Sequence, residues 1–502
     1  TRVTLGVAAG GTEGLLAGVE TALTRDLTLL ADYDTRGVNV GARFAPSPNV
    51  QMDVARVSDG WAGSISLSTD LAPDRPHIGP VVLPQPQFSD GPQNLAERLQ
   101  AVTCGLGMEN VKALVGEGEH GETAVVYYEN RTYLHSELTA LWQVVAAVVA
   151  ELPPSVARVC IITRKQGVPV FRFAVSPDDY VTFLNGEIPI GDFQPMCDVG
   201  HGTDSPVRLA GASGRTRIAQ STRYTADLAI NPVVQTLIGS ETAHLSQRYG
   251  VRPSLEVPLG HGLSINLSRQ VRVGGSLDKN IDPFVRITDT VANVSALFRP
   301  TDYSVGRVAV GDLLGGRRGA AGEAVALVAD GRSVLRGTAG WITEREYDDY
   351  RWFYVGDARY HIPRLDATAT VTFGQYLEGD TGATVGLRKY LGDLEMDAQY
   401  RDTNYGRILM VGATLPIGSR KDRRPDPVRI RESSRFAQHF RAETEDPVTG
   451  DTSVVGASSI GNQLPLFDLT DEYLDRDRLN ATYLWSHPEA ILAGARRVLA
   501  RR

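Results

Sequence analysis

Cysteine is scarce in this sequence, with only Cys104, Cys160 and Cys197 among 502 residues. Three cysteines allow at most one disulfide and leave one thiol over, and no two of them are spaced as CxxC. The sequence therefore argues against a small disulfide-stapled fold and against a zinc ribbon. We expect Cys160, which lies inside an apolar run, to be a core thiol.

An excess of positive charge is also missing, because 59 acidic residues outweigh 51 lysines and arginines and the net charge is −8. Nucleic acid is therefore not expected as a partner. No apolar run reaches the roughly 20 residues that a transmembrane helix needs, and the nearest one, residues 138–152, is interrupted by Gln143. Membrane residence would then require a β-barrel or a lipid anchor. Since no basic and apolar leader follows Thr1, we expect a signal peptide to have been removed or to lie outside this sequence.

Motifs for catalysis, cofactors and metals are lacking as well. None of the nine histidines is part of an HExxH motif or lies four residues from another, and residues 211–214 do not match GxSxG. Residues 116–121 match GxGxxG, but a strand follows instead of a helix, and two glutamates would repel phosphate. We interpret this stretch as a hairpin loop. The sequence predicts no catalytic residue, no metal and no cofactor.

Alternation of apolar with small or polar residues is regular between residues 367 and 415. It occupies the runs 367–373, 383–388, 396–400 and 409–415, and turn-forming residues separate them. A period of two predicts an up-and-down antiparallel meander with one apolar face. A soluble sandwich would turn that face toward its core, whereas an outer-membrane barrel would turn it toward lipid.

The two alternatives place the same side chains in opposite environments. In an outer-membrane barrel, Thr368, Thr370 and Thr372 would face an aqueous lumen, while Val371 and Phe373 would face hydrocarbon. Aromatic residues near the ends of the expected strands are typical of an interfacial girdle. These residues are Tyr347, Tyr350, Trp352, Phe353, Tyr354, Tyr376, Tyr390 and Tyr405. They favour the barrel, although an aromatic content of 7% is low for one.

Composition divides the chain into β-rich and mixed regions. The expected regions are the last strands of a first β-barrel region (1–71), a proline-rich linker (72–93), an α/β domain (94–195), a Gly/Ser-rich linker (196–216), a second β-barrel (217–443) and a polar and helical C-terminal tail (444–502). About six strands in residues 1–71 are too few to close a membrane barrel, so we expect further strands before Thr1. The fold class is therefore mainly β, with antiparallel up-and-down outer-membrane barrel regions flanking a small α/β domain.

Several short motifs follow one another along the chain. They are GGTEG (10–14), LTLLADYD (27–34), VGARF (40–44), YYENRTY (127–133), GDLL (311–314) followed by GE (322–323), and GQYLEGDTGAT (374–384). In this order they resemble the YjbH-like family of exopolysaccharide-associated outer-membrane proteins. The resemblance covers residues 10–415 and implies two barrel regions around a periplasmic insert, with no catalytic residues to carry over. It implies residence in the outer membrane of a Gram-negative cell. The implied partners are extracellular polysaccharide, polysaccharide-export proteins of the periplasm or outer membrane, and the lipid bilayer.

Three functional hypotheses remain open on the sequence alone. The first is a non-catalytic barrel that assists exopolysaccharide export, with a polar lumen whose candidate residues are Thr368, Thr370, Thr372, Arg317, Arg318 and Asp380. The second is a glycan hydrolase or lyase that uses carboxylates in turns at the rim, such as Asp380, Asp393 and Asp402. The third is a barrel that serves only as a platform for partner proteins. We expect Arg317 and Arg318 to lie in a loop.

Overall fold

The computed structural model describes most of the chain and divides it into two compact units. The first unit comprises Thr1–Arg75 with Ile417–Ser419, and the second comprises Pro76–Pro416 with Arg420–Arg502. The described residues are 2–8, 14–22, 27–34, 37–47, 50–57, 60–67, 80–83, 91–133, 135–201, 213–240, 243–275, 290–313, 317–328, 331–344, 350–377, 379–404, 406–415, 417, 427–432, 435–445, 455–458 and 469–500.

The first unit is a 6-stranded antiparallel sheet in the order β1-β2-β3-β4-β5-β6. Its strands are β1 (Arg2–Ala8), β2 (Gly14–Ala22), β3 (Leu27–Asp34), β4 (Gly37–Ser47), β5 (Val50–Val57) and β6 (Gly60–Leu67). The sheet is amphipathic, because Leu29 and Tyr33 are exposed on one face while the Arg43 guanidinium pairs with Glu20 and Asp53 on the other. The six strands agree with the number expected for residues 1–71.

The second unit contains an α/β domain built on a sheet in the order β11-β10-β9-β8-β7-β12. Its elements are α1 (Pro92–Gly105), β7 (Glu109–Gly118), β8 (Gly121–Glu129), α2 (Glu137–Val149), β9 (Arg158–Lys165), β10 (Val168–Val175), α3 (Pro177–Leu184), α4 (Ile190–Phe193), a 3-10 turn (Gln194–Met196), β11 (Asp198–Gly200) and β12 (Gly214–Arg215). Helix α2 crosses from β8 to the parallel strand β9. It begins where Ser136 Oγ accepts a hydrogen bond from the Thr139 amide.

The core of this domain lies between the sheet and α2. Trp142 is fully buried and meets the Phe173 ring edge-on, with the ring centroids 5.0 Å apart. Cys160 is buried in β9, as expected for a core thiol. Residues 116–121 form the turn between β7 and β8, so the hairpin interpretation is confirmed.

Two expected linkers contribute to the domain where they are described. In the proline-rich stretch 72–93, Val81 and Leu83 are buried in the domain core and α1 begins at Pro92. In the stretch 196–216, β11 and β12 add to the two edges of the sheet. A high content of proline and glycine indicates an irregular backbone, and for this reason it predicted linkers. It does not indicate whether the side chains of a segment are buried, because burial depends on what the segment packs against.

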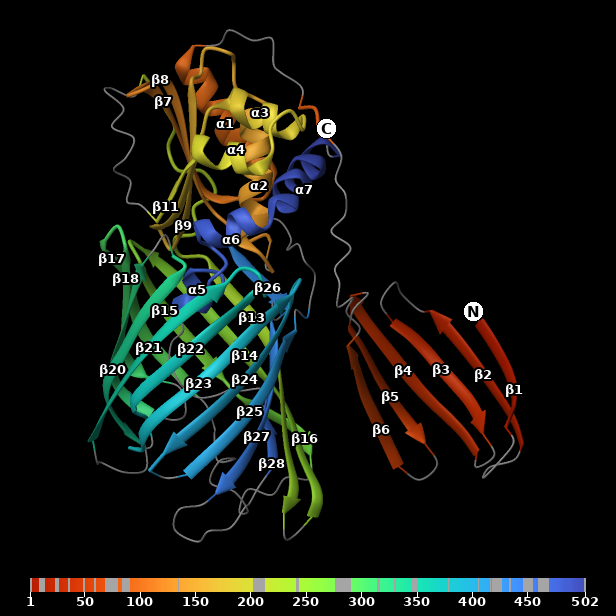
Figure 1. Ribbon diagram of the computed structural model, residues 1–502. Coiled ribbons are helices and arrows are strands. Elements are labelled where there is room, and N and C mark those ends of the chain that lie inside the picture. Colours follow the sequence, from red (N-terminus) through yellow and green to blue (C-terminus); the bar gives the residue numbers. More distant parts are fainter. Residues whose placement is uncertain are drawn as a thin grey trace. The chain divides into compact units, whose positions relative to one another are not determined.

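The remaining strands of the second unit form a 16-stranded sheet that curls round on itself (Figure 1). They are β13 (Ala226–Ser240), β14 (Ala243–Gly260), β15 (Leu263–Arg269), β16 (Val271–Gly275), β17 (Thr290–Thr301), β18 (Ser304–Asp312), β19 (Arg317–Val328), β20 (Ser333–Glu344), β21 (Tyr350–Ile362), β22 (Ala367–Gln375), β23 (Thr381–Leu391), β24 (Leu394–Thr403), β25 (Gly406–Leu415), β26 (Val428–Glu432), β27 (Phe436–Glu445) and β28 (Val455–Ser458).

The pairing is up-and-down from β17 to β25, which confirms the expected antiparallel meander. Strand β28 is hydrogen-bonded to both β27 and β13, and β13 is hydrogen-bonded to β14. The ladder that runs from β14 to β27 therefore returns to β14 through β28 and β13. The short strand β26 is an exception, because it pairs with β13 in parallel. Arg317 and Arg318, expected in a loop, instead begin strand β19.

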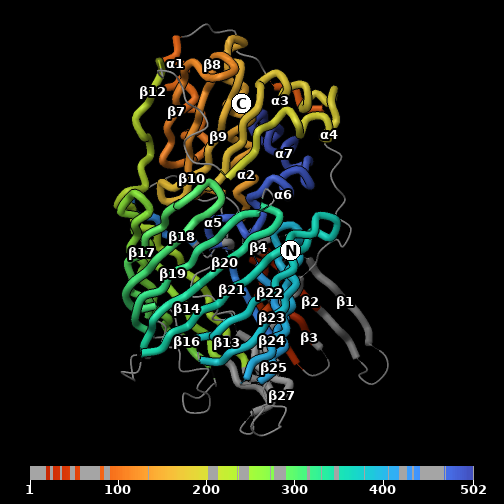
Figure 2. The backbone as a smooth tube through the Cα atoms, turned by 60° about the vertical axis from the view of Figure 1, so that its left-hand side comes forward, coloured from red at the N-terminus to blue at the C-terminus, as the bar shows by residue number. Residues whose placement is uncertain are grey.

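The C-terminal region consists of α5 (Leu469–Tyr473), α6 (Ala481–Ser486) and α7 (Pro488–Leu499). Helix α7 packs on α2 of the α/β domain, and the backbone trace in Figure 2 shows α6 and α7 beside that domain. Gly494 makes this contact possible, because a Cβ atom there would lie 2.4 Å from the Trp142 Cβ. The segment expected to be a polar and helical tail does contain helices, but it also packs against the rest of the unit: β28 joins the sheet, and residues such as Leu474, Leu484 and Ile491 are buried. The composition of residues 444–502 did not indicate this burial, because charged residues of the segment are buried as ion pairs.

Candidate functional site

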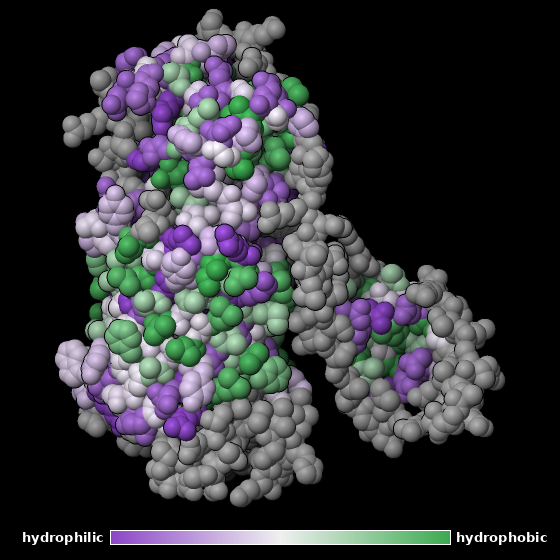
Figure 3. Space-filling view, viewed as in Figure 1, coloured by the Kyte–Doolittle hydropathy of each residue, from purple (hydrophilic) through white to green (hydrophobic). Residues whose placement is uncertain are grey.

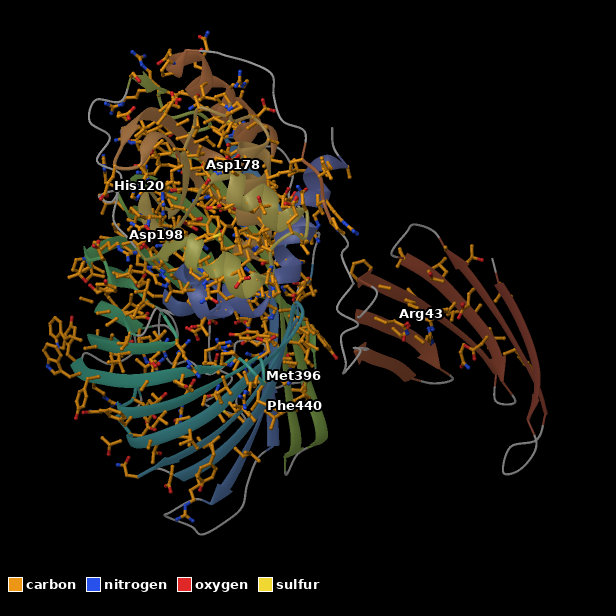
Figure 4. The ribbon with its side chains drawn as sticks, turned by 45° about the horizontal axis from the view of Figure 1, so that its top comes forward. Arg43, His120, Asp178, Asp198, Met396 and Phe440 are labelled. Atoms are coloured by element: carbon orange, nitrogen blue, oxygen red, sulfur yellow. The ribbon has the colours of Figure 1, made fainter. Side chains whose placement is uncertain are left out.

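The two faces of the curved sheet differ sharply in chemistry. Along β21, Trp352 is 67% exposed, whereas its near neighbours on the opposite face, Asp357 and Arg359, are 4% and 6% exposed. On β22, Phe373 is 60% exposed and Thr368 is 2% exposed. Met396 and Phe440, labelled in Figure 4, are likewise exposed. The apolar face therefore points outward and the polar face inward, the reverse of a soluble sandwich.

Aromatic side chains lie near both ends of the outward face. Trp341 stacks on Tyr350 with 4.2 Å between ring centroids and lies 6.4 Å from Trp352, beside the connection between β20 and β21. Near the other end of β21, Tyr360 is exposed, and the Arg332 guanidinium lies over its ring. The interval from Trp352 to Tyr360 corresponds to about 26 Å along a strand, or about 20 Å across a bilayer at a tilt of about 40°.

This aromatic arrangement corrects part of the expected girdle. Tyr350, Trp352 and Tyr354 lie outside, as expected, but three other aromatic residues point inward and are buried, namely Phe353, Tyr376 and Tyr390. Phe353 belongs to a small internal apolar cluster with Leu313, Ile342 and Leu377. Tyr347 and Tyr405 lie outside the described residues. Sequence position near a strand end fixes depth along the barrel, but only the parity within the strand fixes the face.

Hydrophobic residues spread over the outer wall of the barrel, while hydrophilic residues are denser over the α/β domain (Figure 3). Within the described part of the chain, no helix has both the length and the apolar character that a bilayer span needs.

Several short turns of the barrel lie at the end that contacts the α/β domain. The Gly262 amide, in the turn between β14 and β15, donates to the Gln166 carbonyl. Beside the turn between β17 and β18, Arg299 donates to the carbonyls of Pro169 and His201. Asp393, in the turn between β23 and β24, lies 3.8 Å from His135. One end of the barrel is thus covered by the α/β domain.

Charged residues fill the inward positions next to this end. Asp357 accepts hydrogen bonds from both Arg336 and Arg359. The Arg336 guanidinium also lies 3.7 Å from Glu323, and all four side chains are almost completely buried. Such charges are tolerated in a barrel wall only when they face a polar interior or each other.

A second group of inward charges surrounds Glu395. Its carboxylate lies 2.9 Å from Arg388, 3.1 Å from Arg435 and 3.6 Å from Arg476. Arg388 also reaches Asp471 at 2.8 Å. One strand position thus holds three guanidinium groups, and two of them belong to segments far away in the sequence.

Toward the uncovered end, the interior keeps polar contacts of a different kind. The Arg401 guanidinium lies over the Tyr376 ring, 4.5 Å from its centroid, and donates to Thr384. Tyr376 and Thr384 share a hydrogen bond of 2.9 Å between their hydroxyls. Nearby on β24, Asp397 lies 3.0 Å from the His439 imidazole.

A cavity of about 430 Å³ lies where the barrel, the α/β domain and the C-terminal region meet. Its lining includes Arg131, Lys165, Asp227, Arg431 and Glu472. The charges are paired across the boundary: Arg131 lies 3.5 Å and Arg431 lies 2.8 Å from Asp227. Its size falls within the range of small-ligand sites, and most of its lining residues are polar or charged.

Lys165 and Glu137 form a further pair beside this cavity, 3.0 Å apart. Burial raises the pKa of Glu137 against the opposing effect of Lys165. Burial by itself would lower the pKa of Lys165, but Glu137 and Asp475 hold it above its ordinary value. The lysine therefore stays charged, and it anchors the α/β domain to the C-terminal region.

The candidate lumen residues occupy different places. Thr368 is buried and lies 3.4 Å from the His361 imidazole, while Thr370 and Thr372 are half-buried on the same inward face of β22. Arg317 is buried at the inward start of β19. Its neighbour Arg318 points outward, is exposed and pairs with Asp312 at 3.0 Å. Asp380 is buried at the uncovered end, and its carbonyl accepts a hydrogen bond from the Tyr376 amide.

The three turn carboxylates do not converge. Asp380 and Asp402 lie at the uncovered end of the barrel, because β22–β23 and β24–β25 turn there. Asp393 lies at the opposite end beside His135. Asp402 is exposed and pairs with Arg407 at 3.4 Å. Among the described residues, no group of three or more His, Cys, Asp and Glu side chains is placed to hold a metal ion.

Sequence reasoning missed the inward charges. The signal was present, since Asp357 and Arg359 alternate with Ala358 and Tyr360 in the same way as the threonines of β22 alternate with apolar residues. The participation of residues 469–480 had no such signal, because their partners are distant in the sequence.

The family model described as "Exopolysaccharide biosynthesis protein YbjH" matches residues 11–297 of the chain, which is more than half of its length. The chain belongs to the YjbH family. The resemblance noted from the sequence is thereby confirmed, and membership assigns this YjbH-family protein a role related to exopolysaccharide. No curated protein matches it.

Solved structures resemble this YjbH-family protein only weakly. A loop L8 deletion mutant of OmpT, an outer-membrane protein of Vibrio cholerae, is 10% identical with a TM-score of 0.27, and the match covers 47% of this chain and 99% of that chain. The outer-membrane channel DcaP of Acinetobacter baumannii is 11% identical with a TM-score of 0.26, and the match covers 47% and 96% of the two chains. OprB of Pseudomonas putida is 10% identical with a TM-score of 0.26, and the match covers 47% and 91%. Neither function nor location is inferred from these similarities.

Proposed function

We propose that this YjbH-family protein is an outer-membrane β-barrel that assists the export of an exopolysaccharide and catalyses no reaction on it. The observation that carries the proposal is the partition of side chains across the wall, with residues such as Trp352 and Phe373 outside and Asp357 and Thr368 inside. In water, the outward face would be a large exposed apolar surface, which monomeric soluble proteins avoid. In a bilayer it is the favourable arrangement, because the closed ladder satisfies the backbone polar groups.

The interior suits a chain of sugars that must move. Hydroxyls and amides on the inward face, including Thr370 and Thr372, offer single neutral hydrogen bonds to a glycan. Each such bond contributes only about 1 kcal/mol net, so a passing polymer can exchange one for the next. Arg317 and Asp380 add charged contacts near the uncovered end, where a polymer would leave.

The α/β domain is proposed to lie in the periplasm. Short turns mark the periplasmic end of outer-membrane barrels, and three of the short turns here, at 261–262, 302–303 and 392–393, are at the end that this domain covers. The turn between β24 and β25 at the other end is equally short, so the support comes from the number of such turns at the covered end. A domain in this place can dock the periplasmic or outer-membrane export proteins that deliver the polymer.

Membrane residence is tested by fractionation and by electrophoresis before and after boiling. We expect the protein in the outer-membrane fraction and a lower apparent mass for the unboiled sample. Recovery as a soluble periplasmic protein would refute the proposal.

Orientation is tested with single cysteines in a background where Cys104, Cys160 and Cys197 are replaced by serine. Asp402→Cys lies at the uncovered end, and Glu119→Cys lies in the β7–β8 turn of the α/β domain, both at exposed positions. A membrane-impermeant maleimide should label Asp402→Cys in intact cells. It should label Glu119→Cys only after the outer membrane is permeabilised. The opposite pattern would place the domain outside the cell.

Export is tested in cells that lack the protein. We expect polysaccharide to accumulate within the cells and to appear in the medium again after complementation. The non-catalytic part is tested by incubating the purified protein with the purified polymer and measuring reducing ends and unsaturated sugars. Release of either, and its loss in an Asp380→Asn and Asp402→Asn double variant, would show a hydrolase or lyase instead.

A further inference from the structure

Residues 469–480, here called the plug segment, lie against the inner wall of the barrel at its covered end. Except for Asp471 and Glu472, the side chains described within it are buried or nearly so. The Leu469 amide donates to Glu323 of β19, and Asp471 pairs with Arg388 of β23 at 2.8 Å. Asp477 accepts a hydrogen bond of 3.3 Å from Arg359 of β21. These contacts reach three separate strands.

The apolar side of the plug segment also faces the wall. Leu469, Tyr473 and Leu474 belong to one hydrophobic cluster with inward residues of the barrel such as Val325 and Val334. The same cluster continues into the core of the α/β domain. The plug segment thus fills the space between the barrel wall and the domain that covers it.

The other side of the plug segment is bonded to the α/β domain. The Glu137 amide, at the start of α2, donates to Asp475 at 3.1 Å. Arg476 and Arg478 both donate to the His135 carbonyl, at 3.0 and 2.7 Å. The plug segment is therefore held by both the barrel wall and the α/β domain, and it is not a strand of either sheet.

We propose that the plug segment is a gate, which closes the barrel interior at the α/β end and must withdraw before a polymer can pass. This inference rests on the proposed export function and adds a regulated step to it. Residues that line an open aqueous channel would be exposed, whereas Asp357, Arg359, Tyr390 and Glu395 of the wall are each no more than 6% exposed.

The chemistry of the contact suits separation. The wall arginines keep wall partners when the segment leaves, since Arg388 retains Glu395 and Arg359 retains Asp357. These two arginines are therefore not left as uncompensated cations. The exposed surfaces would be charged and readily hydrated, unlike the two halves of an apolar core.

The backbone of the plug segment is strained where it turns. Asp475, Arg476 and Asp477 have φ values of 49°, 61° and 62°, a left-handed run that residues with a Cβ atom rarely adopt. Such a run persists only while its surroundings hold it, and release would relax it. Helix α7 remains a tether, because its contact with α2 does not involve the plug segment.

A disulfide can lock the gate. A Cβ atom at Gly331, in the turn between β19 and β20, would lie 2.6 Å from the Asn480 Cβ and 2.8 Å from His201 Nε2. The turn must therefore move outward by about 1.2 Å to reach the spacing of about 3.8 Å that a disulfide needs. The φ of 82° at Gly331 adds backbone strain, which the single Gly331→Cys variant reports. The locked form is the Gly331→Cys and Asn480→Cys double variant, with the native cysteines replaced by serine. The two single variants are its matched controls. The loosened form is Asp471→Asn with Glu472→Gln and Asp477→Asn, which removes the three plug carboxylates that pair with wall arginines, namely Arg388, Arg307 and Arg359.

The readout is KCl conductance in planar bilayers, using full-length protein whose folding is verified by electrophoresis before and after boiling. We expect the wild type to be mostly closed with rare openings, and the loosened form to conduct at least tenfold more. Oxidation should abolish openings of the locked form, and dithiothreitol should restore them, with no effect on the single-cysteine controls.

Two outcomes would overturn the inference separately from the function. Equal and measurable conductance of wild type and loosened form, or full conductance of the oxidised locked form, would refute the gate and leave the barrel function standing. Absence of conductance from every folded variant, the loosened form included, would refute the export function and the gate with it.

Discussion

The orientation of the barrel wall predicts unequal effects for two neighbouring residues of β22. Phe373 is exposed on the outward face and Thr372 is half-buried on the inward face. Phe373 pairs with Gly356, which lies midway along β21 between Trp352 and Tyr360. At about 3.3 Å per residue and a tilt of about 40°, that position is about 10 Å from either aromatic end, close to the middle of the bilayer.

Phe373→Arg should therefore destabilise the folded barrel strongly. An arginine on the lipid face near the midplane costs about 2–4 kcal/mol. The loss of a phenylalanine from a lipid contact adds to this cost. Thr372→Arg is the matched control, because the same charge then points inward, directly across from Asp357 in the next strand. Since Asp357 already pairs with Arg336 and Arg359, we expect the control to destabilise the barrel, but by less than Phe373→Arg does.

The assay is reversible folding into lipid vesicles along a urea gradient, followed by tryptophan fluorescence and by electrophoresis of unboiled samples. Phe373→Leu keeps an apolar side chain and should remain close to the wild type. If Phe373→Arg is tolerated while Thr372→Arg prevents folding, the wall has the opposite orientation and the proposed membrane location fails. Equal effects at both positions would show that neither face contacts lipid.

Three further predictions concern buried groups. Glu395→Gln leaves three guanidinium groups around a neutral amide and should lower the free energy of unfolding by about 3–5 kcal/mol. Asp402→Asn, which breaks an exposed pair, is the control and should lower it by less than about 1 kcal/mol in the same urea titration. Gly494→Ala should separate α7 from α2 and expose the plug segment to proteolysis. Gly191→Ala is the control and should not, because a Cβ atom there meets nothing within 4 Å. Burial lowers the pKa of His201 from 6.5 to about 4. As pH falls from 6.5 toward 4, only the unfolded chain therefore takes up a proton at this imidazole. The free energy of unfolding should fall by about 3 kcal/mol over that range, and His201→Gln should remove this pH dependence.

Each of these predictions has an outcome that contradicts it. A similar loss for Glu395→Gln and Asp402→Asn would mean that the interior charges are as well solvated as surface charges. Unchanged proteolysis of Gly494→Ala would mean that α7 does not hold the C-terminal region in place. A pH dependence that survives in His201→Gln would assign the proton uptake to another group.

Strand positions and local turns could be predicted from the sequence because they depend on neighbours a few residues apart. The alternation in residues 367–415 predicted β22 to β25, and the glycine-rich stretch 116–121 was correctly interpreted as a hairpin turn. Helices α1 and α2 lie where apolar residues repeat every three or four positions, as at Leu95 and Leu99 and at Leu138, Leu141 and Val145. Each of these signals is a period of 2 or 3.6 that any short window contains.

The tertiary structure decided which face of those strands is polar inside the molecule. Alternation is the same for a soluble sheet and a membrane barrel, and only the return of the ladder to β13 turns the threonines of β22 and the charges of β21 inward. It also decided the role of the C-terminal region, because Asp477 meets Arg359 and Asp475 meets Glu137 across long stretches of chain. A local pattern fixes which side chains share a face, but the environment of that face is set by what the whole sheet encloses.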